Sequence, residues 1–216
     1  MAAIITFAQR KGGAGKTTLA AHLAAGWALA GRRVSAVDVD PQGSLARWGE
    51  LRAALAGAAA LPVAKVSGWR LALELERLRR EAEIVVVDSP PHAELDARAA
   101  IRAADLVVIP VQPSPMDLWA TQATVEMARV ERRRALLVLN RIAPRTRLAQ
   151  EIAAALGAGD VRLAATTLGN RTAFASSLAG GSSVEEEEPG GAAAGEALHL
   201  RAEIEEMLRD GAGRGA

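Results

Sequence analysis

A glycine-rich segment near the start of the chain has the residue types and spacing that suit polyphosphate binding. It reads Lys11-Gly12-Gly13-Ala14-Gly15-Lys16-Thr17-Thr18 and follows a short apolar run. Glycines let successive backbone N–H groups converge on phosphate oxygens, and a helix start adds its positive dipole. Lys16 is placed to reach the β- and γ-phosphates, and the Thr17 hydroxyl to bind Mg²⁺. Residues 11–18 therefore predict a site for ATP and Mg²⁺.

Carboxylates follow two other apolar runs, where a metal ion or a water molecule would meet the phosphates. Asp40 lies just beyond the run that ends at Asp38, and Asp88 ends another run. A carboxylate at the end of a buried strand is costly unless it meets a cation. We expect Asp88 to hold Mg²⁺, and Asp40 to contact the metal and orient the attacking water. Both could instead be helix N-caps, and Asp38 is expected either to be structural or to support the metal ligands from behind.

Short apolar runs alternate with stretches of helical spacing along most of the chain. Strands are expected at 2–8, 34–38, 84–88, 106–111 and 135–140. Helices are expected at 17–30, 44–55, 71–80, 95–104, 118–129 and 148–156. This alternation predicts an α/β fold with a doubly wound, mostly parallel sheet and helices on both faces. Ligands of such sheets bind at the carboxyl ends of the strands, where the candidate residues fall.

The end of the chain differs in composition from the rest. A polar, glycine-rich connection is expected at 180–195, a last helix at 196–208 and a flexible tail at 211–216. Half of the 216 residues are hydrophobic, which is enough for the core of a single domain over residues 1–210.

Composition also excludes several classes of protein. The chain has no cysteine, so it cannot form disulfides, thiolate metal sites or iron–sulfur ligands. The first residues lack the pattern of a signal peptide, and no apolar run reaches the ~18 residues of a membrane span. We therefore expect a cytoplasmic protein.

The phosphate-binding segment departs from the usual G-x-x-x-x-G-K-[ST] motif. Arg10 stands where the first glycine is usual, and Lys11 is a second lysine ahead of Lys16. This pattern resembles the deviant Walker A motif of the ParA/MinD family of P-loop ATPases. In that family the early lysine reaches across a dimer interface to the partner's nucleotide. The resemblance implies an ATP-bound homodimer in which Lys11, Lys16 and Asp40 are catalytic.

The resemblance extends from Ala2 to about Leu208 and implies further roles. Asn140 and Arg141 fall where relatives contact the adenine, although an asparagine at a strand end is also an ordinary turn residue. The last helix has acidic residues in place of the basic face that would bind a membrane. Because the phosphate loop lies so near the start, no preceding DNA-binding domain is expected. The pattern is similar to that of short ParA proteins.

Short ParA proteins bind double-stranded DNA without sequence preference, associate with the nucleoid, and hydrolyse ATP when a cargo adaptor stimulates them. Several arginines lie close together here: Arg129, Arg132, Arg133, Arg134, Arg141, Arg145 and Arg147. We expect Arg145, Arg147 and Arg171 to contact DNA phosphates. The alternative is a solvated face with ordinary surface charge.

A second function belongs to another class. Metabolic enzymes of the dethiobiotin-synthetase type share the phosphate loop, and some also have the early lysine. Lys11 therefore does not separate a partition ATPase from an enzyme that acts on a small substrate. The arginine cluster favours the ATPase that segregates or positions cargo.

Overall fold

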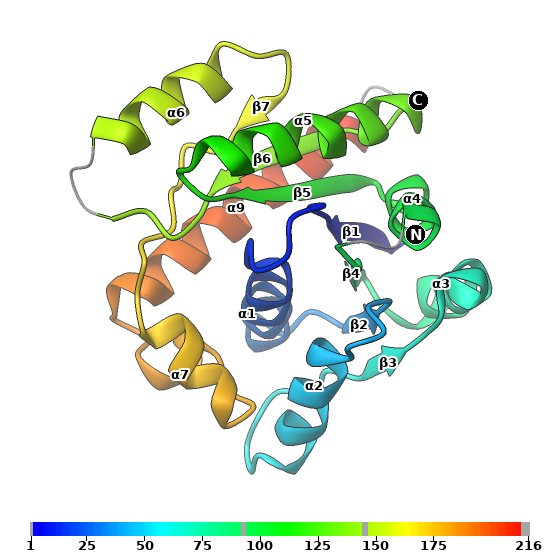
Figure 1. Ribbon diagram of the computed structural model, residues 1–216. Coiled ribbons are helices and arrows are strands. Elements are labelled where there is room, and N and C mark those ends of the chain that lie inside the picture. The colour runs from blue at the N-terminus through cyan, green and yellow to red at the C-terminus, as the bar shows by residue number, and fades with distance from the viewer. Residues whose placement is uncertain (1, 92–93, 144–146, 213–216) are drawn as a thin grey trace.

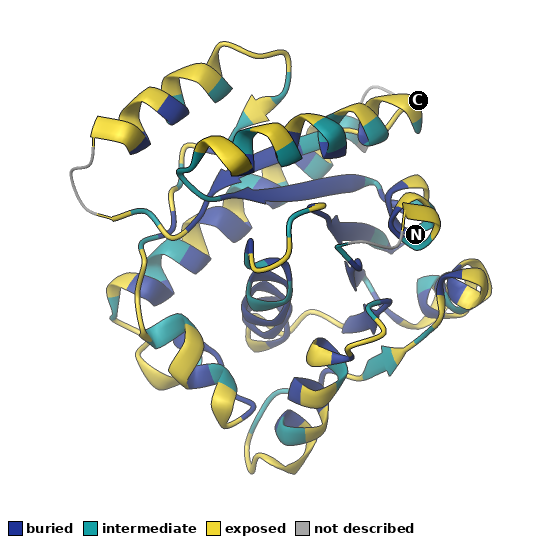
Figure 2. Cartoon of the chain, viewed as in Figure 1, coloured by how far each residue is buried: buried dark blue, intermediate teal, exposed yellow. Residues whose placement is uncertain are grey.

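The computed structural model describes residues 2–91, 94–143 and 147–212. Within these residues a single sheet has the strand order β3-β2-β4-β1-β5-β6-β7, and neighbouring strands are parallel. The strands are β1 (Ala3–Phe7), β2 (Val34–Asp38), β3 (Val63–Lys65), β4 (Ile84–Asp88), β5 (Leu106–Val111), β6 (Ala135–Leu139) and β7 (Arg162–Leu163). The central strands are buried, because helices cover both faces of the sheet (Figures 1 and 2).

Two groups of helices cover the two faces. One group is α1 (Lys16–Leu29), α2 (Ser44–Ala54), α7 (Ala173–Ala179), α8 (Val184–Glu187) and α9 (Ala192–Ala212). The other is α3 (Leu71–Glu81), α4 (Glu94–Ala103), α5 (Pro115–Val130) and α6 (Arg147–Gly157), with the 3-10 helix η1 (Gly68–Arg70) preceding α3. None of the helices in the described ranges is long and apolar enough to cross a membrane.

The expected doubly wound parallel sheet is confirmed, and the differences lie at its edges and near the end of the chain. The short edge strands β3 and β7 were not expected. The expectation of a connection over 180–195 is wrong in part, because α8 lies within it and α9 begins at Ala192. Small residues such as Ala193 and Ala194 are buried there, so they extend the helix against the core. Helix α9 continues through Ala212, two residues into the expected tail, and 213–216 lie outside the described residues.

Candidate functional site

The glycine-rich segment forms the loop between β1 and α1 at the carboxyl edge of the sheet (Figure 1). Gly13 has φ 76° and Gly15, which precedes α1, has φ 99°. Side chains other than glycine rarely adopt such values. A Cβ at position 15 would also lie 2.3 Å from Asn140 Nδ2. Gly15 is therefore required both by its backbone conformation and by its neighbour.

Asn140, which directly follows β6, contacts this loop. Its Nδ2 donates to the Ala14 carbonyl at 2.8 Å, and its Oδ1 accepts from the Arg141 N–H at 2.9 Å. Arg141 has φ 55°, a conformation that is uncommon for a residue other than glycine. The adenine contact expected for Asn140 and Arg141 stays a prediction. What the structure adds is a contact of Asn140 with the phosphate loop.

Lys16, Thr17 and Asp88 come together where α1 begins and β4 ends. Thr17 Oγ1 donates to Asp88 Oδ2 at 2.5 Å, whereas the buried Oδ1 of Asp88 has no hydrogen-bond partner among the described residues. Burial raises the pKa of Asp88 to about 7. Burial lowers the pKa of Lys16, and the charges of Asp88 and Asp40 oppose that effect. The free oxygen and the neighbouring hydroxyl are ligands that suit Mg²⁺, so the residues present fit this ion.

Asp38 ends β2 and Asp40 lies two residues beyond it, and the two aspartates have different surroundings. Asp38 is fully buried, and its carboxylate accepts from the backbone N–H of Asp40 at 3.0 Å and of Ala46 at 2.9 Å. These two bonds join the end of β2 to the start of α2, which is a structural role. Asp40 is partly exposed, and its Oδ1 accepts from the N–H of Gln42 at 3.0 Å. Since β2 pairs with β4, Asp40 lies on the same edge as Asp88.

Lys11 is bound to its own chain through a residue of α5, a pairing that the sequence did not predict. Its ammonium donates to Oδ2 of Asp117, which also accepts from Ser114 Oγ. Asp117 lies in the first turn of α5, is fully buried, and has an Oδ1 without a hydrogen-bond partner in the described ranges. Gln112, just before α5, donates to the Gly13 carbonyl at 2.6 Å. The segment before α5 therefore holds the front of the phosphate loop.

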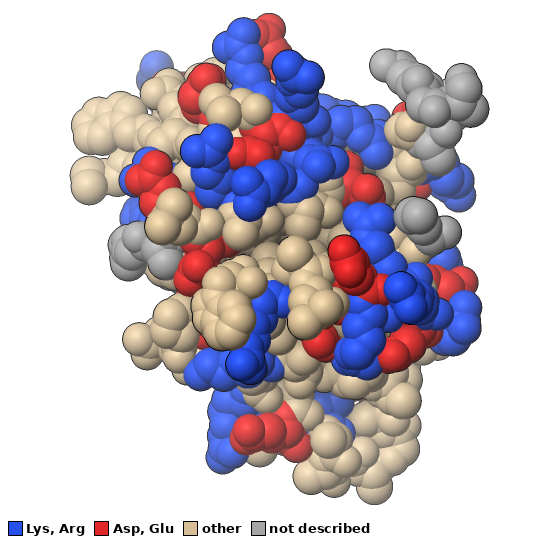
Figure 3. All heavy atoms as spheres, turned by 90° about the vertical axis from the view of Figure 1, so that its right-hand side faces the viewer, with Lys and Arg blue, Asp and Glu red and all other residues tan. Residues whose placement is uncertain are grey.

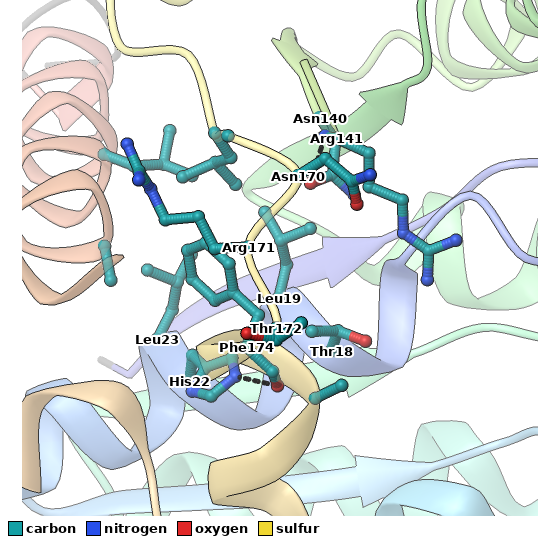
Figure 4. Close-up of a pocket in the computed structure, with 15 residues that line it drawn as sticks. Thr18, Leu19, His22, Leu23, Asn140, Arg141, Asn170, Arg171, Thr172 and Phe174 are labelled. Atoms are coloured by element: carbon teal, nitrogen blue, oxygen red, sulfur yellow. Dashed lines mark hydrogen bonds between the residues drawn. The ribbon is translucent and has the colours of Figure 1, made fainter. Parts of the chain in front are cut away.

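A pocket of about 270 Å³ opens beside α1, next to Thr18 (Figure 4). Asn140 and Arg141 line it from one side, and the segment 169–175 lines it from the other. His22 lies at its base, where Nε2 donates to the Phe174 carbonyl at 2.9 Å. The pocket combines apolar surface with amide and hydroxyl groups and adjoins the phosphate loop.

The structure separates the arginines that are adjacent in the sequence. Arg132–Arg134 precede β6 and Arg141 follows it, so the two groups lie at opposite ends of a five-residue strand that spans about 16 Å. Arg147 is exposed and pairs with Glu151 at 2.8 Å. Arg171 donates twice to Glu196 on α9. Arg145 lies outside the described residues. The DNA contacts expected of these arginines remain predictions.

The phosphate loop and the parallel sheet together define a P-loop nucleotide-binding protein. The chain belongs to the CobQ/CobB/MinD/ParA nucleotide-binding domain family, which it matches over residues 5–184. It is therefore an ATPase of the ParA/MinD type.

Two sequence relatives and one solved structure illustrate this likeness. The chain is 32% identical to the maintenance of carboxysome distribution protein A of Halothiobacillus neapolitanus over 82% of its length and 84% of that protein. It is 33% identical to the chromosome-partitioning ATPase Soj of Thermus thermophilus, over 71% of its length and 75% of that protein. The septum site-determining protein MinD of Pyrococcus horikoshii, solved with Mg-ADP, has a TM-score of 0.80 at 21% identity, over 98% of this chain and 99% of that one.

Proposed function

We propose that this chain positions or segregates a cargo through cycles of ATP binding and hydrolysis. ATP and Mg²⁺ bind at residues 11–18 and close a homodimer, the dimer binds double-stranded DNA without sequence preference, and a cargo adaptor stimulates hydrolysis. DNA binding would place the protein on the nucleoid. The relatives named for carboxysome distribution and chromosome partitioning support this proposal.

The observation that carries the proposal is the arrangement around the phosphate loop. Thr17 and Asp88 present a hydroxyl and a carboxylate oxygen where a nucleotide-bound Mg²⁺ would meet them. When bound, that ion would neutralise charge on the phosphates. Lys16 would contact the same phosphates, and Asp40 would orient the water that attacks them. Lys11 stands at the front of the loop, from which it would reach a second subunit after leaving Asp117.

The pocket beside α1 suits the remaining part of ATP. It adjoins Thr18 and offers amide groups from Asn140 and Asn170 together with the ring of Phe174. A pocket with apolar walls and a few placed polar groups is typical of a small-molecule site. We propose that the adenosine of ATP lies here, which agrees with the positions of Asn140 and Arg141.

The first experiment measures retention of the full-length protein on DNA with ATP, with ADP and without nucleotide, at two salt concentrations. We expect retention only with ATP and weaker retention at the higher salt, because phosphate contacts release counterions. An Asp40→Ala variant loaded with ATP should remain on the DNA. Equal binding in all nucleotide states would refute the switch.

Matched variants test the arginines. Arg147→Ala and Arg171→Ala should each weaken ATP-dependent retention, whereas Arg77→Ala should not. Arg77 is an exposed arginine that pairs with Glu81 four residues along α3, as Arg147 does with Glu151 on α6, so it controls for loss of charge. If no nucleotide state binds DNA, ADP release with small substrates would test the metabolic alternative.

A further inference from the structure

A groove beside the edge strand β3 lies apart from the phosphate loop. It has a volume of about 730 Å³ and runs between β3 and the start of α3. We call it the β3 groove and define it by residues at and just after the end of β3, in η1 and in α3: Lys65, Val66, Trp69, Arg70, Leu73 and Glu74. Figure 3 views the molecule from the side of α3 and α4, where basic and acidic side chains alternate among uncharged surface. Because β3 is an edge strand, the groove lies at one edge of the sheet.

Large apolar side chains are exposed in this groove. Trp69 is 78% exposed and Leu73 is 74% exposed, and they lie four residues apart where η1 continues into α3. Exposed apolar side chains that share one hollow mark interaction sites, and tryptophan is enriched among residues that dominate binding energy. Leucine offers aliphatic surface, which suits a protein partner better than the stacked bases of a nucleic acid. The groove thus has the apolar centre of a protein-binding site.

The charges of the groove favour an acidic partner. The Arg70 guanidinium stacks on the Trp69 ring, 4.5 Å from its centroid, and has no carboxylate partner in the part of the chain that the structure describes. Lys65 Nζ donates to the Pro41 carbonyl at 2.9 Å and likewise has no described carboxylate partner. Glu74, the one carboxylate among the groove's defining residues, is bound twice by Arg77. Two cations are therefore left to attract carboxylates.

Lys65 also connects the groove to the loop that carries Asp40. Its ammonium binds the carbonyl of Pro41, the residue after Asp40, and a Cβ at Gly43 would lie 2.6 Å from Lys65 Nζ. Lys65 pairs in register with Asp38 across β2 and β3. A carboxylate that drew Lys65 into the groove would remove its bond to Pro41, one of the contacts that hold this loop.

We propose that the β3 groove binds a segment of a protein partner that combines acidic and large apolar side chains. Binding changes ATP turnover, because the segment competes with Pro41 for Lys65 and so shifts the loop that bears Asp40. The effect on turnover rests on the proposed role of Asp40, whereas binding in the groove does not depend on it.

In the test, a library of random 12-residue peptides is selected for binding to the full-length protein in the presence of ATP. The best binders are then synthesised, and their affinity is measured by fluorescence anisotropy. We expect selected peptides to combine Asp or Glu with Leu, Phe or Trp. Trp69→Ser and Leu73→Ser should each weaken them about tenfold or more, the loss of a binding hot spot. Val130→Ser, which changes an exposed side chain on α5, should leave affinity unchanged.

ATP turnover provides the second readout. The selected peptide should change turnover of the original protein, and Lys65→Met should abolish that change while binding stays within a few-fold. Trp69→Ser should keep its basal turnover and its ATP-dependent retention on DNA, which separates this proposal from the proposed function. The proposal would be overturned if the selection yielded basic peptides or no peptides. It would also be overturned if Trp69→Ser left the affinity of the selected peptides unchanged. Trp69-dependent binding of oligothymidylate in place of peptide would overturn it as well.

Discussion

The contact between Lys11 and Asp117 makes an asymmetric prediction about stability. Asp117 is fully buried, whereas the Lys11 side chain is 36% exposed. Lys11→Ala leaves a buried carboxylate with Ser114 Oγ and no cation. Asp117→Asn leaves an ammonium that water can reach. The lysine variant should therefore be much less stable than the asparagine variant, although each removes the same ion pair.

The expected magnitudes follow from burial. Removing one partner of a buried ion pair costs about 3 kcal/mol when the other charge stays behind, as it does in Lys11→Ala. Asp117→Asn keeps a polar group beside Ser114 and should cost about 1 kcal/mol, the value of one hydrogen bond. For a domain of this size these losses lower Tm by roughly 6–12 °C and 2–4 °C respectively. The double variant should resemble Asp117→Asn, since neither charge then remains.

Urea unfolding without nucleotide measures these differences, with Arg47→Ala as the control. Arg47 is exposed and pairs with Glu50, so its loss should stay within about 0.5 kcal/mol. A Lys11→Ala variant as stable as Asp117→Asn would refute the reasoning, and so would a double variant no more stable than Lys11→Ala. The result also bears on function. If Lys11→Ala failed to form an ATP-dependent dimer, part of that failure would come from the lower stability of the variant.

Further predictions concern the phosphate loop and two buried groups. Gly15→Ala should abolish ATP binding measured by calorimetry, because a Cβ displaces Asn140 and φ 99° is strained. Burial lowers the pKa of His22 from 6.5 to about 4, so the folded state favours the neutral imidazole. This contribution to the free energy of unfolding is fully present above pH 6.5, and about 3 kcal/mol of it is lost as the pH falls to 4. His22→Gln should remove that part of the pH dependence of urea unfolding. Arg52→Ala should cost about 3 kcal/mol, because it leaves Glu186 without its buried cation.

The central sheet and the phosphate loop could both be predicted from the order of residues along the chain. Short, continuous Val, Ile and Leu runs are typical of buried strands in a covered parallel sheet, and the expected strands differ from β1, β2, β4, β5 and β6 by two residues at most. The phosphate loop is local as well, because consecutive N–H groups and the following helix supply its binding power. The edge strands β3 and β7 were too short to produce a pattern.

Contacts between residues far apart in the chain could not be predicted in this way. Asp117 contacts Lys11 across 106 positions, and Asn140 reaches Ala14 across 126 positions. The same holds for the arginines, which form one cluster in the sequence and two groups once β6 separates them. Exposure was also undetermined, since Trp69 would equally suit a core position. Local patterns report burial and periodicity, whereas contacts between separate elements depend on the order in which the strands pair.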